Sequence, residues 1–158
     1  MEIKRLIEEG ILKISPHSKV NEMVALIVGS SGESVLGDVS ISRPERAIPW
    51  GIPVPGDPTQ VMYVWCDALS NYISALGYGS GNEEKFKTFW PADIQVIGKD
   101  IVRFHALLWP AFLLSAKLPL PREIFVHGFI TSGGKKMSKS IGNVLESDDF
   151  INEYGVDA

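Results

Sequence analysis

The sequence contains one cysteine and no long apolar run. Cys66 alone cannot form an internal disulfide or a zinc site built from several cysteines. No stretch of about 18 uncharged apolar residues is present to cross a bilayer. The first nine residues carry mixed charge in a helical pattern, without the apolar core of a secretory signal peptide. We therefore expect a cytoplasmic protein with no membrane contact and no protein-bound zinc.

The sequence also lacks a basic surplus. Its 15 Lys and Arg residues stand against 19 Asp and Glu, and the net charge of −4 argues against a broad basic face for nucleic acid. The charge is nevertheless uneven, because Lys135, Lys136 and Lys139 lie in residues 131–140 without an acidic neighbour. A compact positive spot suits a small phosphate-bearing molecule better than a long duplex, although most short lysine clusters are solvated surface.

The N-terminal part of the sequence shows only short helix or strand patterns. Residues 2–9 predict a short amphipathic helix that ends at Gly10. Asn21 is a candidate N-cap for the apolar run 23–28, which fits a helix or a buried strand equally well. Gly29 to Ser34 has the composition of a flexible loop. We expect residues 1–43 to be a connecting segment, helical with a loop.

Half of the ten prolines fall in residues 44–58, which predicts an ordered, extended connector rather than a strand or a helix. Strand and helix patterns then alternate. The predicted strands are 61–65, 94–97 and 123–127. The predicted helices are 67–77 with Asp67 as cap, 83–90, a long helix capped by Asp100 that carries Pro110, and 147–154. Repeated βα units predict an α/β fold with a parallel sheet, in which ligands bind beyond the carboxyl ends of the strands.

The most specific motif is the pentapeptide Lys136-Met137-Ser138-Lys139-Ser140, with Gly133-Gly134 before it and Gly142 after it. Two ammonium groups three residues apart can surround a polyphosphate, and the glycines let the backbone approach closely. An isolated Lys-Ser-Lys would more often belong to a polar hairpin loop. The complete pentapeptide after the strand that ends at Val126-His127 favours the phosphate-binding interpretation.

Polar groups also follow the strand 94–97. Gly98 admits a close ligand, and Asp100 is either a helix N-cap or a carboxylate that accepts hydrogen bonds from ribose hydroxyls. His105 follows one turn later, where a histidine is more often a hydrogen-bonded core residue. Trp65 and Tyr72 lie near the end of the strand 61–65, and such aromatics are usually core. Together with His105 they would form an apolar pocket with a few polar tips, suited to a thioether side chain.

These motifs resemble a known family. Residues 38–43 and 50–55 are similar to segments shared by the methionyl, isoleucyl, valyl and leucyl class I aminoacyl-tRNA synthetases, and the pentapeptide is the KMSKS loop of that class. Residues 63–72 and 98–110 look specifically like the methionyl-tRNA synthetase family. The resemblance covers roughly residues 20–158. It implies that residues 44–158 are the C-terminal half of a Rossmann-type catalytic domain, with a partial Rossmann-type parallel sheet.

The resemblance also assigns roles to residues. It implies a methionine pocket lined by Trp65, Ala68, Leu69, Tyr72, Ile101 and His105. It implies an ATP site at Gly98, Asp100, Lys136, Ser138 and Lys139, with Lys136 and Lys139 as the catalytic charges and Mg²⁺ beside the phosphates. The complete enzyme would form methionyl-adenylate from methionine and ATP, and would then transfer the methionyl group to the acceptor end of tRNA.

The sequence departs from the family in what it omits. The family's His-x-Gly-His-type motif is absent, since His17, His105 and His127 have no such spacing. The strand with that motif, the zinc knuckles and the helical anticodon-binding domain are absent too. We therefore expect this chain to need an N-terminal catalytic half as its partner. Two alternatives stay open: an isoleucyl-, valyl- or leucyl-type fragment, or a non-catalytic fragment that binds only nucleotide or a partner.

This expectation gives a first prediction. The 158-residue chain alone should show no methionine-dependent exchange of pyrophosphate into ATP, because half of the expected catalytic groups are not in its sequence. The measurement is isotope exchange with protein purified free of host synthetase. Robust exchange by the chain alone would contradict the half-domain interpretation.

Overall fold

The structure is a computed structural model that describes residues 2–29 and 36–157. The chain forms two compact units, one running to Val126 and the other starting at His127, and each is described by itself. Strands and helices alternate, and the main sheet is parallel, which confirms the predicted α/β class. The domain boundary proposed at residue 43 stays a prediction. Among the described residues, no helix is both long and apolar enough to cross a membrane.

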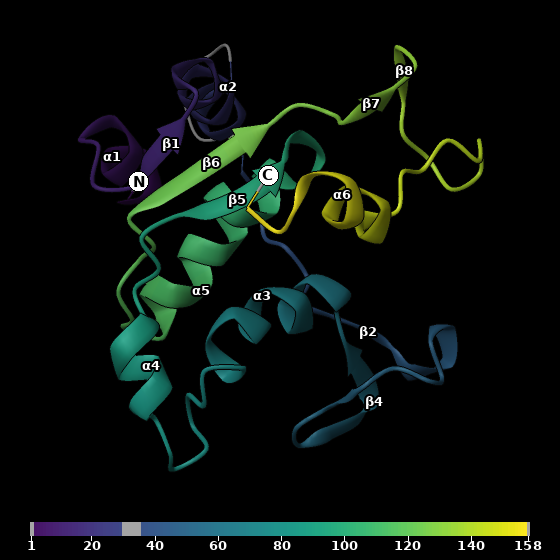
Figure 1. The fold of residues 1–158 in the computed structure, drawn as a ribbon. Helices are drawn as coiled ribbons and strands as arrows, with labels where there is room; N and C mark the ends of the chain where they lie inside the picture. Colours follow the sequence, from purple (N-terminus) through teal and green to yellow (C-terminus); the bar gives the residue numbers. More distant parts are fainter. Residues whose placement is uncertain (1, 30–35, 158) are drawn as a thin grey trace. The chain divides into compact units, whose positions relative to one another are not determined.

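The main sheet has three strands in the order β1-β6-β5 (Figure 1): β1 (Lys13–Ser15), β6 (Glu123–His127) and β5 (Gln95–Gly98). Two of them, β5 and β6, lie where the sequence predicts strands. The sequence did not indicate β1, which is three residues long and pairs in parallel with β6. In this register Lys13 is opposite Glu123, and its ammonium donates to the Glu123 carboxylate at 2.6 Å. The hydrogen bond from Lys13 lowers the pKa of that carboxyl.

The N-terminal helices pack against the same sheet. They are α1 (Glu2–Glu8) and α2 (His17–Val28). The apolar run 23–28 is therefore helical, and Asn21 lies inside α2 rather than at its N-cap, which is Pro16. Gly10 ends the first helix as predicted, with a φ of 71° and its N–H bonded to the Ile7 carbonyl. Beyond Gly29, the C-cap of α2, the predicted loop lies outside the described residues.

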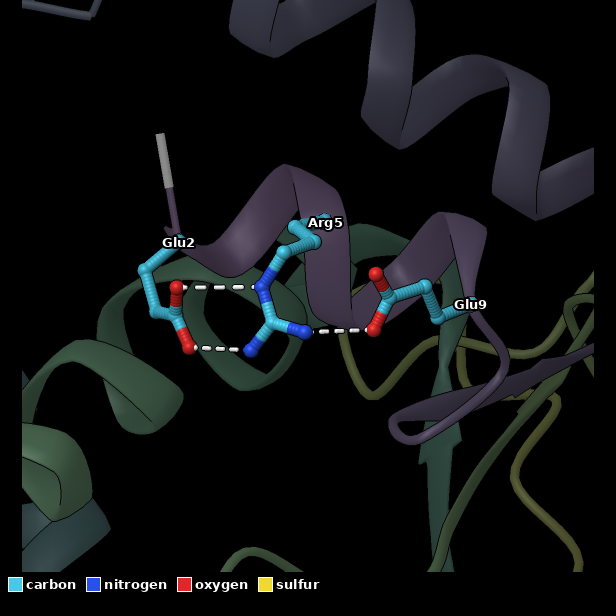
Figure 2. Close-up of polar contacts among 3 residues, drawn as sticks. All are labelled: Glu2, Arg5 and Glu9. Atoms are coloured by element: carbon cyan, nitrogen blue, oxygen red, sulfur yellow. Dashed lines mark hydrogen bonds and ion pairs between the residues drawn. The ribbon is translucent and has the colours of Figure 1, made fainter.

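The outer face of α1 carries a small ion network around Arg5 (Figure 2). Its guanidinium donates to both carboxylate oxygens of Glu2, at 3.2 and 2.6 Å, and to Glu9. These contacts lower the pKa of Glu2 and raise that of Arg5. All three side chains are about half exposed, so the network stabilises the helix only weakly.

A second sheet, antiparallel and in the order β2-β4-β3, corrects the prediction for residues 44–58. Its strands are β2 (Ser42–Pro44), β3 (Pro53–Val54) and β4 (Asp57–Met62), with a 3₁₀ turn at Glu45–Ala47. Both β2 and β3 are edge strands. Prolines are tolerated on edges because their missing N–H can face away from the ladder. The proline-rich segment therefore forms short strands and a turn instead of an unpaired connector.

The strand predicted at 61–65 is wrong in its second half. It ends at Met62, and helix α3 (Val64–Ser74) begins two residues later with Tyr63 at its N-cap. Trp65 is therefore helical, and Asp67 lies in the first turn rather than at the cap. An apolar run fits either structure, and here Leu69 and Ile73 continue a buried helical stripe.

The chain then follows the predicted order more closely. Helix α4 (Glu84–Phe89) precedes β5, and a helical segment covers 99–115. That segment contains a 3₁₀ turn (Lys99–Ile101), a π turn (Phe104–Leu108) and helix α5 (Trp109–Ser115). Gly98 occupies the N-cap position, so Asp100 lies within the first turn and is not the cap.

Two cores flank this helical segment. The sheet core contains residues of α1, α2, β5 and β6 together with Val102, Ala106 and Leu107. The aromatic core contains Trp90, Trp109 and Leu113 together with Leu69 and Ile73 of α3. The helical segment is therefore packed on two sides.

The second unit is a hairpin followed by a helix. The hairpin pairs β7 (Thr131–Ser132) with β8 (Lys135–Lys136) through Gly133 and Gly134, whose φ values are 57° and 75°. Positive φ at both central residues is typical of a type I′ turn, which glycine adopts without strain. Helix α6 (Ser147–Tyr154) has the predicted bounds.

The small sheet generates a second prediction. A Cβ added at Gly51 would lie 2.8 Å from the Cβ of Val61, a buried branched side chain with little room to move. Gly51→Ala should therefore destabilise the protein by about 1–3 kcal/mol. Denaturant unfolding measures this, with Gly37→Ala as the control because its added Cβ meets nothing within 4 Å. Equal effects of the two substitutions would show that the contact with Val61 is easily relieved.

Candidate methionine and nucleotide site

Two helices bring three of the predicted pocket residues together. Trp65 and Tyr72 come from α3, and His105 comes from the π turn. The ring centroids of Trp65 and His105 are 6.1 Å apart, and those of Tyr72 and His105 are 5.6 Å apart, both edge-on. The three rings therefore meet as predicted. Trp65 reaches the others from a helix rather than from a strand end, and the strand before α3 belongs to the antiparallel sheet, not to the parallel sheet that the prediction assumed.

Hydrogen bonds fix the tautomer of His105. Its Nδ1 lies 3.0 Å from the Ile101 carbonyl oxygen, which can only accept, so Nδ1 carries the proton. Nε2 is then unprotonated and accepts from the Tyr72 hydroxyl at 2.9 Å. His105 is only 2% exposed, and burial lowers its pKa, partly opposed by the bond to Ile101. Burial also raises the pKa of Tyr72. Both groups are therefore held neutral.

The other predicted pocket residues have different exposures. Ala68 is exposed on α3, and Ile101 is half-buried against the sheet core. Leu69 is fully buried in the aromatic core, so it supports the rings from beneath. Cys66 is half-buried beside Trp65, and burial, reinforced by the charge of Asp67, raises the pKa of its thiol.

The structure adds two rings to which the sequence gave no role. Phe104 stacks on Trp65 with centroids 3.8 Å apart and planes 9° from parallel. Trp109 lies 6.0 Å from the Tyr72 ring and is fully buried; its indole N–H is among the buried groups without a hydrogen-bond partner in the described part of the chain. The sequence shows Phe104 next to His105 and Trp109 four residues after it, but the π turn decides which way the two rings face.

The predicted ribose contacts lie at the carboxyl end of β5. Gly98 is the last residue of the strand, and Asp100 is exposed in the following 3₁₀ turn. The first N–H groups of a helical segment are not bonded within it and can face a ligand. Gly98 and Asp100 therefore occupy the strand end at which doubly wound sheets bind nucleotides.

The lysine loop belongs to the second unit and has internal contacts of its own. The Lys136 ammonium lies 3.7 Å from the centroid of Phe129. The side-chain amide of Asn143 accepts from the N–H of Ser138 at 2.9 Å and donates to the Lys136 carbonyl at 3.2 Å. Lys139 is exposed. Asn143 therefore joins two backbone positions of the pentapeptide. The residue pattern did not indicate this role, although asparagine just after a glycine such as Gly142 is common in turns.

No group of three or more His, Cys, Asp or Glu side chains that could hold a metal ion occurs in residues 2–29 and 36–157.

Comparison with known proteins identifies the family. The family model described as "tRNA synthetases class I (M)" matches residues 3–158. The chain belongs to this family. Among curated relatives, the methionine–tRNA ligase of Brucella suis biovar 1 is 52% identical over 144 residues, which cover 91% of this chain and 26% of that protein. Methionine–tRNA ligase 1 of Bacillus cereus is 50% identical over 145 residues, covering 92% and 21%.

Solved structures of the family agree with the fold. The methionyl-tRNA synthetase of Mycobacterium tuberculosis in complex with methionyl-adenylate matches with a TM-score of 0.75 and 42% identity, covering 99% of this chain and 31% of that one. Its apo form matches with a TM-score of 0.66 and 43% identity over 80% of this chain. The predicted class I fold and the resemblance to the methionyl branch are confirmed. The chain spans about a quarter of the length of the curated relatives named above.

The buried His105 of this class I chain gives a third prediction. Because its folded pKa is lowered, its contribution to stability is fully present above the ordinary histidine pKa of about 6.5 and is lost as the pH falls below that value. The unfolded chain takes up the proton first, so acid favours unfolding. Thermal unfolding followed from about pH 7.5 to pH 5 should fall less steeply for His105→Gln than for the unsubstituted chain. His17→Gln, at an exposed histidine, is the control; equal pH slopes in both variants would contradict the assignment.

Proposed function

We propose that this chain is the part of a cytoplasmic methionine–tRNA ligase that binds the methionine side chain and the phosphates of ATP. The observation that carries the proposal is the Trp65–Tyr72–His105 ring set in a chain of the class I (M) family that also contains the complete KMSKS pentapeptide. The match to a relative described as a complex with methionyl-adenylate supports it.

The methionine pocket uses apolar surfaces and one polar tip. Trp65, Ala68 and Ile101 contribute surface for a flexible thioether, and Leu69 supports them from the core. The Tyr72 hydroxyl donates its proton to His105, so its oxygen remains a neutral acceptor for a ligand. A site of this kind favours an uncharged side chain, because burying an unpaired charge beside these rings would be costly.

The nucleotide site uses backbone and positive charge. Gly98 and Asp100 hold the ribose, and Lys136, Ser138 and Lys139 hold the phosphates. Mg²⁺ would accompany ATP, since this ion is commonly bound through substrate phosphates and only one or two carboxylates. Lys136, Ser138 and Lys139 supply donors for phosphate and no carboxylate of their own, so the ion would be held mainly by the phosphates.

The reaction would need positioning more than proton transfer. The methionine carboxylate is ionised at neutral pH, so it can attack the α-phosphorus in line while the bond to pyrophosphate breaks. Lys136 and Lys139 would stabilise the charge that moves onto pyrophosphate. The terminal hydroxyl of tRNA would then displace AMP from the methionyl-adenylate.

The fourth prediction tests the lysine loop in the full-length enzyme. Lys139→Ala should reduce the rate of adenylate formation by about 10²-fold or more, because its charge acts mainly in the transition state. Methionine binding should change little. Single-turnover adenylation and equilibrium methionine binding measure the two effects.

Lys135→Ala is the matched control, because Lys135 lies in the same hairpin but outside the pentapeptide. An equal loss in adenylation for both variants would mean that the loop lysines contribute only general positive charge, and no loss for Lys139→Ala would mean that the loop is structural. If the unsubstituted enzyme forms no adenylate with methionine, the proposed function itself is wrong.

A further inference from the structure

The helical segment 99–115 changes its buried face part-way along. In a straight α-helix, Val102, Ala106, Trp109 and Leu113 fall on a single stripe, because they are spaced by four, three and four residues. In the structure, Val102 and Ala106 pack into the sheet core, whereas Trp109 and Leu113 pack into the aromatic core with α3 and α4. The helix surface has therefore turned between Ala106 and Trp109.

The π turn at Phe104–Leu108 accounts for this change. The N–H of Trp109 donates to the carbonyl of Phe104, five residues back instead of four. A π turn holds one extra residue, so everything beyond it is rotated by roughly 100° relative to a regular α-helix. Leu107 and Leu114, each one position after a member of the regular stripe, pack against the sheet core instead.

Pro110 is the feature of the sequence that opposes a regular helix at this point. An α-helix would require residue 110 to donate to the carbonyl of Ala106, and proline has no N–H. Its ring would also collide with that carbonyl. Pro110 is fully buried at the start of α5, immediately beyond the last π hydrogen bond. A wider turn relieves both conflicts, because the hydrogen bonds there run to the residue five positions back.

The π turn also determines which rings surround Tyr72 in the proposed methionine pocket. His105 lies within the π turn and Trp109 directly follows it, and their rings flank Tyr72 with centroids 5.6 and 6.0 Å away. Trp109 also meets Trp90 edge-on at 5.8 Å, so it ties Tyr72 to the aromatic core. Without the extra residue, Trp109 would turn toward the sheet, and Tyr72 would lose one of the two rings that hold it.

We propose that Pro110, through the π turn that it imposes, is a positioning residue for the methionine pocket. Pro110 acts by setting where His105 and Trp109 face, and it directly follows Trp109 in the chain. This inference rests on the proposed function, because methionine is the ligand whose binding it is expected to affect.

The test uses the full-length enzyme with two substitutions, Pro110→Ala and Pro110→Val. Both restore the N–H and remove the ring, but valine nearly preserves the buried volume while alanine does not. Both variants should raise the KM for methionine by roughly tenfold to a hundredfold, the range expected when a binding group is misplaced by about 1 Å. The KM for ATP should be almost unchanged. Pro121→Ala is the control, because Pro121 is an equally buried proline outside this helix.

A spectroscopic measurement separates positioning from general damage. The ¹⁵N shifts of His105 report whether Nε2 still accepts from Tyr72, and both Pro110 variants should shift that resonance while Pro121→Ala leaves it in place. This measurement also decides the question if one variant is too unstable for kinetics.

Three results would overturn the inference. Recovery of the methionine KM in Pro110→Val would show that buried volume matters and not the missing N–H. Unchanged KM and ¹⁵N shifts in both variants would show that packing alone holds the π turn. An equal rise in KM for Pro121→Ala would show a general loss of stability. In each case methionine-dependent adenylation by the unsubstituted enzyme leaves the proposed function intact, whereas its absence would refute that function separately.

Discussion

The hydrogen bond between Tyr72 and His105 is the contact that joins the two helical segments carrying the ring set. A buried histidine is tolerated when it is neutral and both of its nitrogens are bonded. Here the Ile101 carbonyl, one helical turn earlier, accepts a hydrogen bond from the Nδ1–H and leaves Nε2 to accept from another helix. The bond to Ile101 therefore fixes the tautomer of the imidazole, and the bond to Tyr72 fixes the direction of the tyrosine proton and links α3 to the helical segment 99–115.

The helical segment 99–115, which carries His105, serves two cores at once. A regular helix presents one apolar stripe, which would satisfy either the sheet or the aromatic cluster. The π turn divides the helix into two phases, so that Ala106 faces the sheet and Trp109 faces the aromatic rings. The hydrogen bonding of the turn is less regular than that of an α-helix, and the burial of large side chains such as Trp109 offsets this cost.

The sequence predicted the parts of this arrangement that depend on local pattern. The strands at β5 and β6 and the bounds of α6 follow from apolar runs and breakers, and the ring set follows from residue type near strand ends. It could not predict β1, whose three residues form a strand only because β6 pairs with them. The start of α3 was misplaced because an apolar run fits a strand and a buried helix equally well. The π turn was missed because its effect appears only when both cores are known.

In the lysine loop, the Lys136 ammonium packs on an aromatic ring, and the backbone around it is fixed by separate hydrogen bonds. Lys136 lies over the face of Phe129, and an exposed cation–π contact of this kind contributes about 0.5–1 kcal/mol. A hydrogen bond to a charged group contributes about 1.5–3 kcal/mol, which is more than a contact of this kind. Asn143 meanwhile fixes the backbone at Ser138 and Lys136 independently of either side chain. The backbone of the loop is therefore held by Asn143 separately from the Lys136 side chain, which in the proposed function is the group that meets the polyphosphate.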